Sequence, residues 1–253
     1  IEFIKALDEM GLKPAIISGT SIGAIIGAFY AAGISGLEME NYVKEIKFKD
    51  LYKMIDLSLI KNSAVLKGDG VEEFLTSKIP IHDFEALPIP LKIVATDFWK
   101  RDEVIIESGQ IIPAVRASIS LPAMFKPVEL QGRVLIDGGA VNPLPYDIIR
   151  DQCDILIAID VSGEKIPDED NSVPKMFECI LSTFQIMQTS IVESKMALSK
   201  PDIYIKPVLR NIRVLDFHRY KEIMEGVQED VLVFKKKLRA LLTSDEPLNS
   251  PQP

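Results

Sequence analysis

The pentapeptide GTSIG at residues 19–23 constrains the fold of this chain more than any other segment. A short apolar run, residues 15–18, precedes it, and an apolar stretch with helical character, residues 24–32, follows it. A strand, a sharp turn and a helix in this order form the context in which G-x-S-x-G makes a nucleophile elbow. We therefore expect the hydroxyl of Ser21 to be exposed at the start of a helix, where the helix dipole favours developing negative charge.

Two other interpretations of this segment remain open at this point. Ser21 is also a suitable N-cap for a helix that starts in a glycine-rich turn. In addition, residues 14–37 carry no charge, and glycines recur every four residues, as in paired membrane helices. Polar residues at the start of the segment leave about 13 continuous apolar residues, which is too few to cross a bilayer. We therefore favour a helix packed closely on a sheet.

The rest of the chain alternates strand-like and helix-like patterns. The most apolar strand, residues 154–161 (DILIAIDV), is of the kind that is covered on both faces in a parallel sheet. The pattern predicts an α/β fold, a three-layer α/β/α arrangement with a mostly parallel central sheet. We expect the apolar stripe of residues 176–198 to pack in the core. Further strands are expected at 91–96, 103–106, 133–136 and 202–206, and further helices at 111–118 and 220–241.

The domain organisation is predicted to be simple. Residues 1–243 form one domain, and residues 244–253, rich in Pro, Ser and Asn, form a disordered tail. Helical spacing is already present at Ile1, without an N-cap before it, so we expect an upstream strand and turn that are not part of this sequence.

Charge and cysteine content exclude several classes of function. The 253 residues carry a formal net charge of −8, and the pI is about 5.0, which argues against nucleic-acid binding. The 2 Cys residues neither form a disulfide framework nor show a metal-ligand spacing. We therefore expect a cytoplasmic protein with no cofactor and no metal.

A serine nucleophile needs a base, and the chain offers few. It has 2 His residues, His82 and His218. The order of Ser21, an acid at Asp137 or Asp160, and His218 would suit a hydrolase triad, although His218 falls where the last helix is expected to start. Asp137 directly follows a strand and precedes two glycines, so it is the stronger candidate, provided that burial raises its proton affinity. An ordinary hairpin turn remains the alternative for the Asp-Gly-Gly segment.

Taken together, these segments resemble the patatin-like phospholipase family. The resemblance rests on the elbow, on residues 94–97 (VATD), on residues 116–127 (RASISLPAMFKP) and on the Asp-Gly-Gly segment followed by Asn142 and Pro143. The compact length is similar to that of the bacterial members related to the catalytic domain of neuropathy target esterase. The motif positions besides Ser21 and Asp137 are Gly19, Gly23, Gly138 and Gly139.

The resemblance implies a serine lipid acyl hydrolase of the phospholipase A or lysophospholipase type. In it Ser21 would be the nucleophile and Asp137 the general base of a Ser–Asp dyad that forms an acyl-enzyme. The family's glycine-rich oxyanion loop would lie upstream of Ile1, which leaves the backbone N–H of Ile22 as the donor within this sequence. The implied partner is a lipid ester, with peripheral membrane contact.

Two alternatives to the dyad hydrolase are a Ser-His-Asp esterase that uses His218 and a non-catalytic acyl-lipid-binding protein of the same fold. For membrane contact, residues 44–55 combine large apolar side chains with four lysines. They fit either a mobile flap that docks on a membrane or an amphipathic helix that covers the core.

Overall fold

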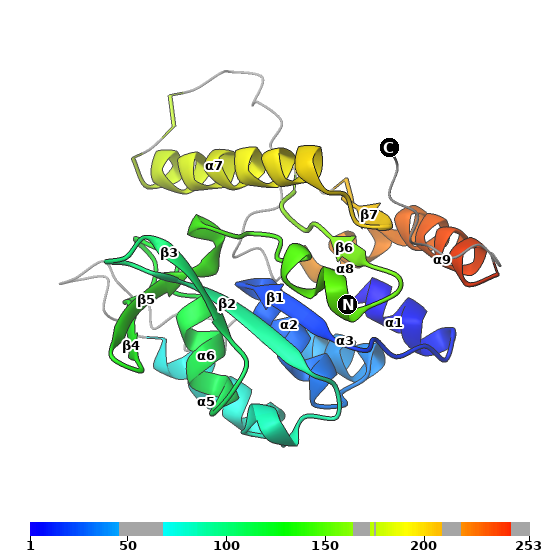
Figure 1. Ribbon diagram of the computed structural model, residues 1–253, viewed down its shortest axis with the longest axis horizontal. Coiled ribbons are helices and arrows are strands. Elements are labelled where there is room, and N and C mark those ends of the chain that lie inside the picture. The colour runs from blue at the N-terminus through cyan, green and yellow to red at the C-terminus, as the bar shows by residue number, and fades with distance from the viewer. Residues whose placement is uncertain (46–67, 164–172, 175, 209–218, 244–253) are drawn as a thin grey trace.

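The computed structural model describes residues 1–45, 68–163, 173–174, 176–208 and 219–243. Two sheets and the helices around them form the described part of the chain (Figure 1). The strands are β1 (Ile17–Thr20), β2 (Leu91–Asp97), β3 (Asp102–Ile106), β4 (Val128–Leu130), β5 (Arg133–Asp137), β6 (Ile157–Ile159) and β7 (Ile203–Ile205). The α-helices are α1 (Glu2–Glu9), α2 (Ile22–Ala31), α3 (Gly36–Glu45), α5 (Asp69–Lys78), α6 (Ile111–Ser118), α7 (Met176–Leu198), α8 (Tyr220–Gly226) and α9 (Gln228–Thr243).

The five-stranded sheet contains both kinds of strand pairing. β1 runs parallel to β2, whereas β3 and β5 both pair antiparallel to β2, and β4 pairs antiparallel to β5. β6 and β7 form a separate parallel pair, as expected for the apolar strand in residues 154–161, although β6 is shorter than that range. The predicted α/β class is confirmed. Among the described strands, parallel pairing occurs at β1–β2 and β6–β7.

Helices cover the larger sheet in layers. In Figure 1, α2, α5 and α6 lie below the sheet, and α7 runs along its other side. The main apolar core lies between β2 and the helices α2, α5 and α6, and includes Ala28, Leu75, Ile93 and Val115. A second core joins α1 and α9 to β6 and β7, with the rings of Phe3 and Phe234 in edge contact at 5.6 Å. The layered arrangement supports the predicted α/β/α architecture.

Helix α7 differs from the expectation of core packing. Met176 is 83% exposed and Met187 56% exposed, and Ile180, Ile186 and Leu198 are also exposed. The residues of α7 that contact the rest of the protein include the apolar Val192 and the polar Gln188 and Lys195, so the apolar stripe alone was a poor guide. None of the described helices is both long and apolar enough to span a membrane.

Other boundaries differ in small ways from the predicted ones. The single helix expected over residues 220–241 is two helices, α8 and α9, that meet at Val227. The tail at 244–253, His218 and most of residues 44–55, interpreted as a membrane flap or a covering helix, lie outside the described residues.

Candidate active site

The strand pairings bring the carboxyl ends of β1 and β5 together. β3 occupies one hydrogen-bonding edge of β2 along residues 93–97. Along the other edge, β1 pairs with residues 91–94 and β5 pairs with residues 95–97 in the opposite direction. Thr20 is therefore opposite Val94, and Asp137 is opposite the next residue, Ala95. Two strands that approach each other head to head along one edge place residue 21 next to residue 137.

Ser21 lies at a sharp, strained turn between β1 and α2. Its backbone has φ 54° and ψ −121°, a conformation that costs free energy in a residue other than glycine. The Ser21 N–H donates to Oγ of Ser118 at 2.8 Å, and the Ser118 hydroxyl donates to the carbonyl of Val94 at 2.6 Å. Ser118 thus ties the turn to β2. The resemblance to the family rested in part on residues 116–127, but the sequence did not reveal this contact.

The interpretation of Ser21 as a helix cap is not supported. Ser21 does occupy the N-cap position of α2, but its side chain makes no capping hydrogen bond. The hydroxyl instead donates to Oδ2 of Asp137 at 2.7 Å. The side chain is thus directed at the carboxylate across the sheet and away from its own helix.

The carboxylate of Asp137 is almost completely buried. Its residue is 1% exposed, and its second oxygen, Oδ1, accepts a hydrogen bond from the N–H of Gly139 at 2.7 Å. The backbone carbonyl of Asp137 accepts a hydrogen bond from Thr96 Oγ1 at 2.9 Å. Desolvation raises the pKa of Asp137 to about 6, even though the hydrogen bonds from Ser21 and Gly139 act in the opposite direction.

The Asp-Gly-Gly segment does not form a hairpin turn. Residues Gly138–Ala140 form a 3-10 turn, and the Asp137 side chain caps it through Gly139. A Cβ atom on Gly138 would lie 2.3 Å from the carbonyl oxygen of Val94, and one on Gly139 would lie 2.0 Å from Nε2 of Gln188 in α7. The turn therefore fits tightly against the backbone of β2 at Gly138, whereas a side chain at position 139 would have to displace the end of the Gln188 side chain.

The two glycines of the elbow differ from each other. A Cβ atom on Gly19 would lie 2.4 Å from the carbonyl oxygen of Gly23, so the elbow needs glycine at position 19. A Cβ atom on Gly23 would meet no atom within 4 Å. Of these two motif positions, the space around the elbow therefore requires glycine at 19 but not at 23.

The loop that contains Asn142 is held by α7 and contacts the residues next to both Ser21 and Asp137. Thr20 Oγ1 donates to the carbonyl of Asn142 at 2.7 Å, and the Asn142 N–H donates to the carbonyl of Gly138 at 2.8 Å. Nζ of Lys195 in α7 donates to Oδ1 of Asn142 at 2.5 Å and to the Asp147 carboxylate. Desolvation lowers the pKa of Lys195, against the effect of Asp147. Sequence reasoning missed Lys195, because it lies within an apolar helical stripe that was assigned to the core.

The alternative bases lie elsewhere or outside the described residues. Asp160 accepts hydrogen bonds from the Tyr204 hydroxyl at 2.9 Å and from the Ser162 N–H at 2.9 Å, on the side of β6 and β7. His82 is exposed in the loop before Phe84. The N–H of Ile22, the expected oxyanion donor, is in the first turn of α2, where backbone N–H groups have no partner within the helix.

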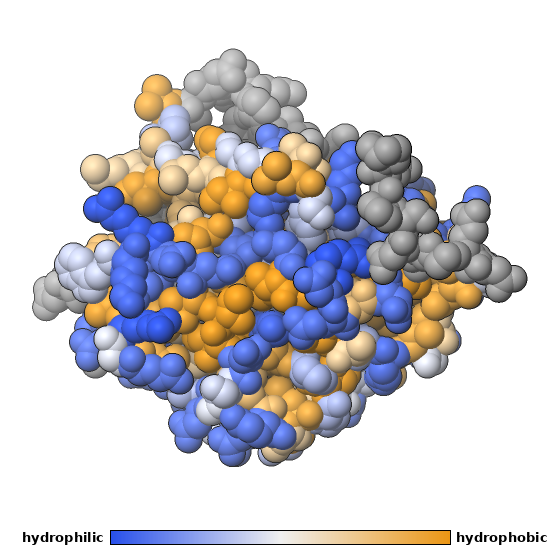
Figure 2. All heavy atoms as spheres, in the orientation of Figure 1, coloured by the Kyte–Doolittle hydropathy of each residue, from blue (hydrophilic) through white to orange (hydrophobic). Residues whose placement is uncertain are grey.

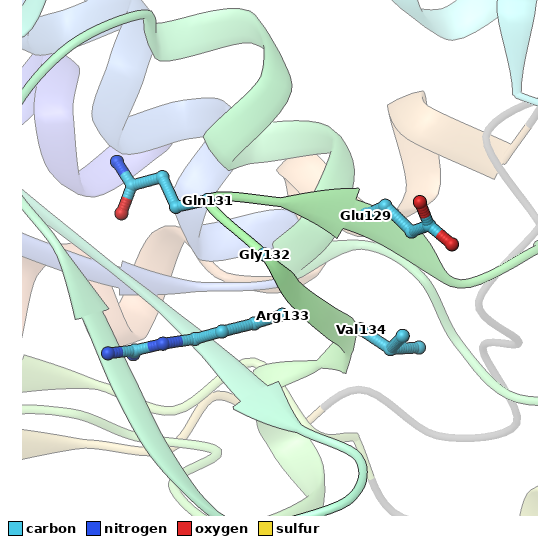
Figure 3. Close-up of a pocket in the computed structure, with 5 residues that line it drawn as sticks. All are labelled: Glu129, Gln131, Gly132, Arg133 and Val134. Carbon is cyan, nitrogen blue, oxygen red and sulfur yellow. The ribbon is translucent and has the colours of Figure 1, made fainter.

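A separate hollow lies at the hairpin of β4 and β5. Glu129, Gln131, Gly132, Arg133 and Val134 line it, with Gln131 and Arg133 on one side and Glu129 and Val134 on the other (Figure 3). Arg133 is at the start of β5 and Asp137 at its end, which separates them by about 13 Å along the strand. The hollow is therefore distinct from the Ser21–Asp137 pair. Within the described residues, no cluster of three or more His, Cys, Asp or Glu side chains is suited to hold a metal ion.

Comparison with known proteins gives a consistent result. An uncharacterized NTE family protein of Mycobacterium tuberculosis is 32% identical over 166 residues, which cover 65% of this chain and 46% of that protein. Patatin-like phospholipase domain-containing protein 7 of Rattus norvegicus is 25% identical, over 89% of this chain and 19% of its own length. Lysophospholipase NTE1 of Kluyveromyces lactis is also 25% identical, over 88% of this chain and 17% of its own length.

The matched region therefore spans less than half the length of each of these relatives. The profile of the family described as Patatin-like phospholipase matches residues 1–150, which contain both Ser21 and Asp137. The chain belongs to the patatin-like phospholipase family.

Proposed function

We propose that this protein is a serine lipid acyl hydrolase in which Ser21 is the nucleophile and Asp137 the general base. The observation that carries the proposal is the 2.7 Å hydrogen bond from the Ser21 hydroxyl to a carboxylate that is 1% exposed. A carboxylate in water is a poor base toward a hydroxyl. Burial raises the pKa of Asp137 to about 6, so it binds a proton more strongly and is still ionised at neutral pH.

Acylation would start with attack of Ser21 Oγ on the carbonyl carbon of a lipid ester. The hydroxyl proton moves to Oδ2 of Asp137 as the new C–O bond forms. The carbonyl oxygen becomes negatively charged in the tetrahedral intermediate, and the N–H of Ile22 at the start of α2 donates to it. When the intermediate collapses, the ester C–O bond breaks, and Asp137 returns its proton to the departing alcohol.

Deacylation repeats these proton transfers with water. Asp137 accepts a proton from a water molecule as the water oxygen attacks the acyl-enzyme carbonyl. The bond to Ser21 Oγ then breaks, the serine regains a proton from Asp137, and the fatty acid leaves. One carboxylate thus serves as base and acid in both halves of the reaction, so no histidine is required.

The substrate class rests on family membership. The family's name and that of its relative Lysophospholipase NTE1 refer to phospholipid and lysophospholipid esters. We propose the same class, phospholipase A or lysophospholipase in type, for residues 1–243, together with peripheral contact at a membrane. A triad that uses His218 and an acyl-lipid-binding protein without turnover are the alternatives.

Three variants test the assignment on a panel of phospholipids and lysophospholipids. Ser21→Ala and Asp137→Asn should each reduce fatty-acid release by at least about 10³-fold, because each removes a group that takes part in both steps. His218→Ala should retain nearly full activity. Retained hydrolysis in Ser21→Ala would remove Ser21 as the nucleophile, and a large loss in His218→Ala would favour the triad.

A fluorophosphonate probe separates the hydrolase from a binding protein. An activated serine reacts covalently with such a probe, so the wild-type chain should be labelled and Ser21→Ala should not. Lipid binding without labelling and without fatty-acid release would indicate a binding protein.

A further inference from the structure

The turn between β2 and β3 displays two aromatic side chains to solvent. Phe98 is 46% exposed and Trp99, the chain's single tryptophan, is 75% exposed. Their rings contact each other edge to face, with centroids 4.9 Å apart. Adjacent exposed aromatic side chains are unfavourable in water, and such patches mark surfaces that contact a partner.

The backbone of this turn is held in place by hydrogen bonds. Oδ1 of the buried Asp97 accepts from the N–H of Trp99 at 3.1 Å and from the N–H of Lys100 at 3.0 Å. The carbonyl of Asp97 accepts from the N–H of Arg101 at 2.8 Å, and the N–H of Phe98 donates to the carbonyl of Val134 at 2.9 Å. The exposure of the aromatic pair is therefore built into a fixed turn, so little conformational entropy is lost when the pair binds.

The residues next to the aromatic pair define the chemistry of the partner. Lys100 and Arg101 are both exposed, and the exposed Asp102 offsets one of the two positive charges. Tryptophan and phenylalanine beside lysine and arginine are typical of the water–lipid interface, where the rings enter the headgroup region and the cations attract anionic lipids. The positive charge is a local feature, because the chain as a whole has a net charge of −8.

The turn follows β2, the strand with which both β1 and β5 of the candidate active site pair. β1 and β2 are parallel, Ser21 follows the carboxyl end of β1, and the turn follows the carboxyl end of β2. Ala95 of β2 pairs with Asp137, and β2 ends two residues later at Asp97, about 7 Å further at the rise of a strand, where the turn begins. Figure 2 also shows exposed apolar atoms on α7, which lies over this side of the sheet in Figure 1.

We propose that residues 98–101 form a membrane anchor, which inserts Phe98 and Trp99 into an anionic phospholipid surface and holds it with Lys100 and Arg101. An anchor at this position would bring the Ser21 site to its substrate at the surface. The link to substrate rests on the proposed function, whereas the binding of lipid by the turn is independent of it.

The single tryptophan provides a direct test. We would use the full 253-residue chain carrying Ser21→Ala, so that vesicles stay intact, with vesicles of phosphatidylcholine containing phosphatidylglycerol. Trp99 emission should shift to shorter wavelength when these vesicles are added, and lipids brominated in their acyl chains should quench it. Emission that is unchanged by vesicles would overturn the proposal. So would emission that shifts only with protein concentration in buffer, because a second copy would then cover the pair.

Co-sedimentation with the same vesicles measures the contribution of each part. Lys100→Ala with Arg101→Ala should weaken binding about 30-fold, since each cation near an anionic surface contributes about a factor of five. Phe98→Ala with Trp99→Ala should weaken it by more than about tenfold. Two control variants on α9, Lys236→Ala with Lys237→Ala and Leu232→Ala, remove side chains that are also exposed and should bind like the parent. An equal loss in the controls would contradict a localised anchor.

Activity measurements distinguish this proposal from the proposed function. With Ser21 intact, Phe98→Ala with Trp99→Ala should hydrolyse a water-soluble short-chain ester at the parent rate and a vesicle substrate at least about tenfold more slowly. Equal rates on vesicles would contradict the anchor. If the parent hydrolyses neither substrate but Trp99 still enters vesicles, the proposed function fails and the anchor stands.

Discussion

Nζ of Lys195 lies 2.5 Å from Oδ1 of Asn142, and this contact joins helix α7 to the loop that supports both Ser21 and Asp137. The carbonyl of Asn142 accepts a hydrogen bond from Thr20, and its N–H donates to Gly138, so the backbone of one residue contacts both neighbours of the candidate pair. Nζ of Lys195 also donates to the carbonyl of Leu144 at 2.9 Å. The ammonium group of Lys195 is therefore one of the contacts that hold α7 over the site.

Lys195→Met should loosen this attachment. The change leaves the Asn142 and Leu144 oxygens without their charged donor, and hydrogen bonds to charged groups contribute about 1.5–3 kcal/mol each. Because solvent reaches part of the site, we expect a total loss of about 1–3 kcal/mol in the free energy of unfolding, measured by urea denaturation, and a lower kcat. Lys206→Met, which removes a more exposed lysine from a 3.8 Å ion pair with Asp160, is the control and should have a much smaller effect. Equal effects of the two changes would contradict a special role for Lys195.

The pKa of Asp137 predicts how hydrolysis depends on pH. A general base must be ionised, so kcat/KM should be constant above the pKa of about 6 and fall about tenfold per pH unit below it. The profile is measured on a water-soluble ester, so that lipid packing does not change with pH. A profile that stays flat down to pH 4.5 would exclude Asp137 as the base.

The same shift predicts how stability depends on pH. Burial raises the folded-state pKa of Asp137 from 3.8 to about 6, so the folded protein binds this proton more tightly than the unfolded chain does. The stabilisation is present below pH 4 and is lost as pH rises through 6, by about 1–3 kcal/mol for a shift of this size. Asp137→Asn should remove this component, seen as a smaller decrease in unfolding free energy between pH 4 and pH 7. An identical decrease in both proteins would show that Asp137 is not desolvated.

The two glycines of the elbow should respond differently to alanine. Gly19→Ala places a methyl group against the backbone of Gly23, where the atoms cannot move aside, so we expect a loss of more than about 2 kcal/mol of stability and a displaced Ser21. Gly23→Ala meets open space in the first turn of α2 and should be neutral or stabilise by up to about 1 kcal/mol. Thermal unfolding of both variants checks this, and equal destabilisation would contradict the close contact.

The sequence was a good guide to the local features of the site. The apolar runs beside the elbow predicted β1 and α2, and the strand before Asp137 was also recognised. These features depend on neighbouring residues, which is why local patterns reveal them. That Ser21 and Asp137 lie within hydrogen-bonding distance depends on β1 and β5 sharing one edge of β2, a relationship between segments 116 residues apart.

Other features could not be read from residue patterns. The apolar stripe of α7 predicted burial, but five of its large apolar residues are exposed, since periodicity does not show which face has a partner. The hydrogen bonds of Lys195 to the loop at Asn142 could not be predicted, because its neighbours in the sequence form an apolar helical pattern. The exposure of Trp99 was not predicted from the sequence, because it depends on the turn that the hydrogen bonds of Asp97 hold in place.

The head-to-head meeting of β1 and β5 has a consequence for how such a chain can diversify. The distance between the Ser21 hydroxyl and the Asp137 carboxylate depends on backbone pairing of β1 and β5 with consecutive residues of β2, Val94 and Ala95. Such backbone pairing tolerates most changes of side chain. Surface helices and loops that make no contact with Ser21, Asp137 or Asn142 can therefore change during evolution, and the lipids accepted can change with them, without altering the geometry of the chemical step.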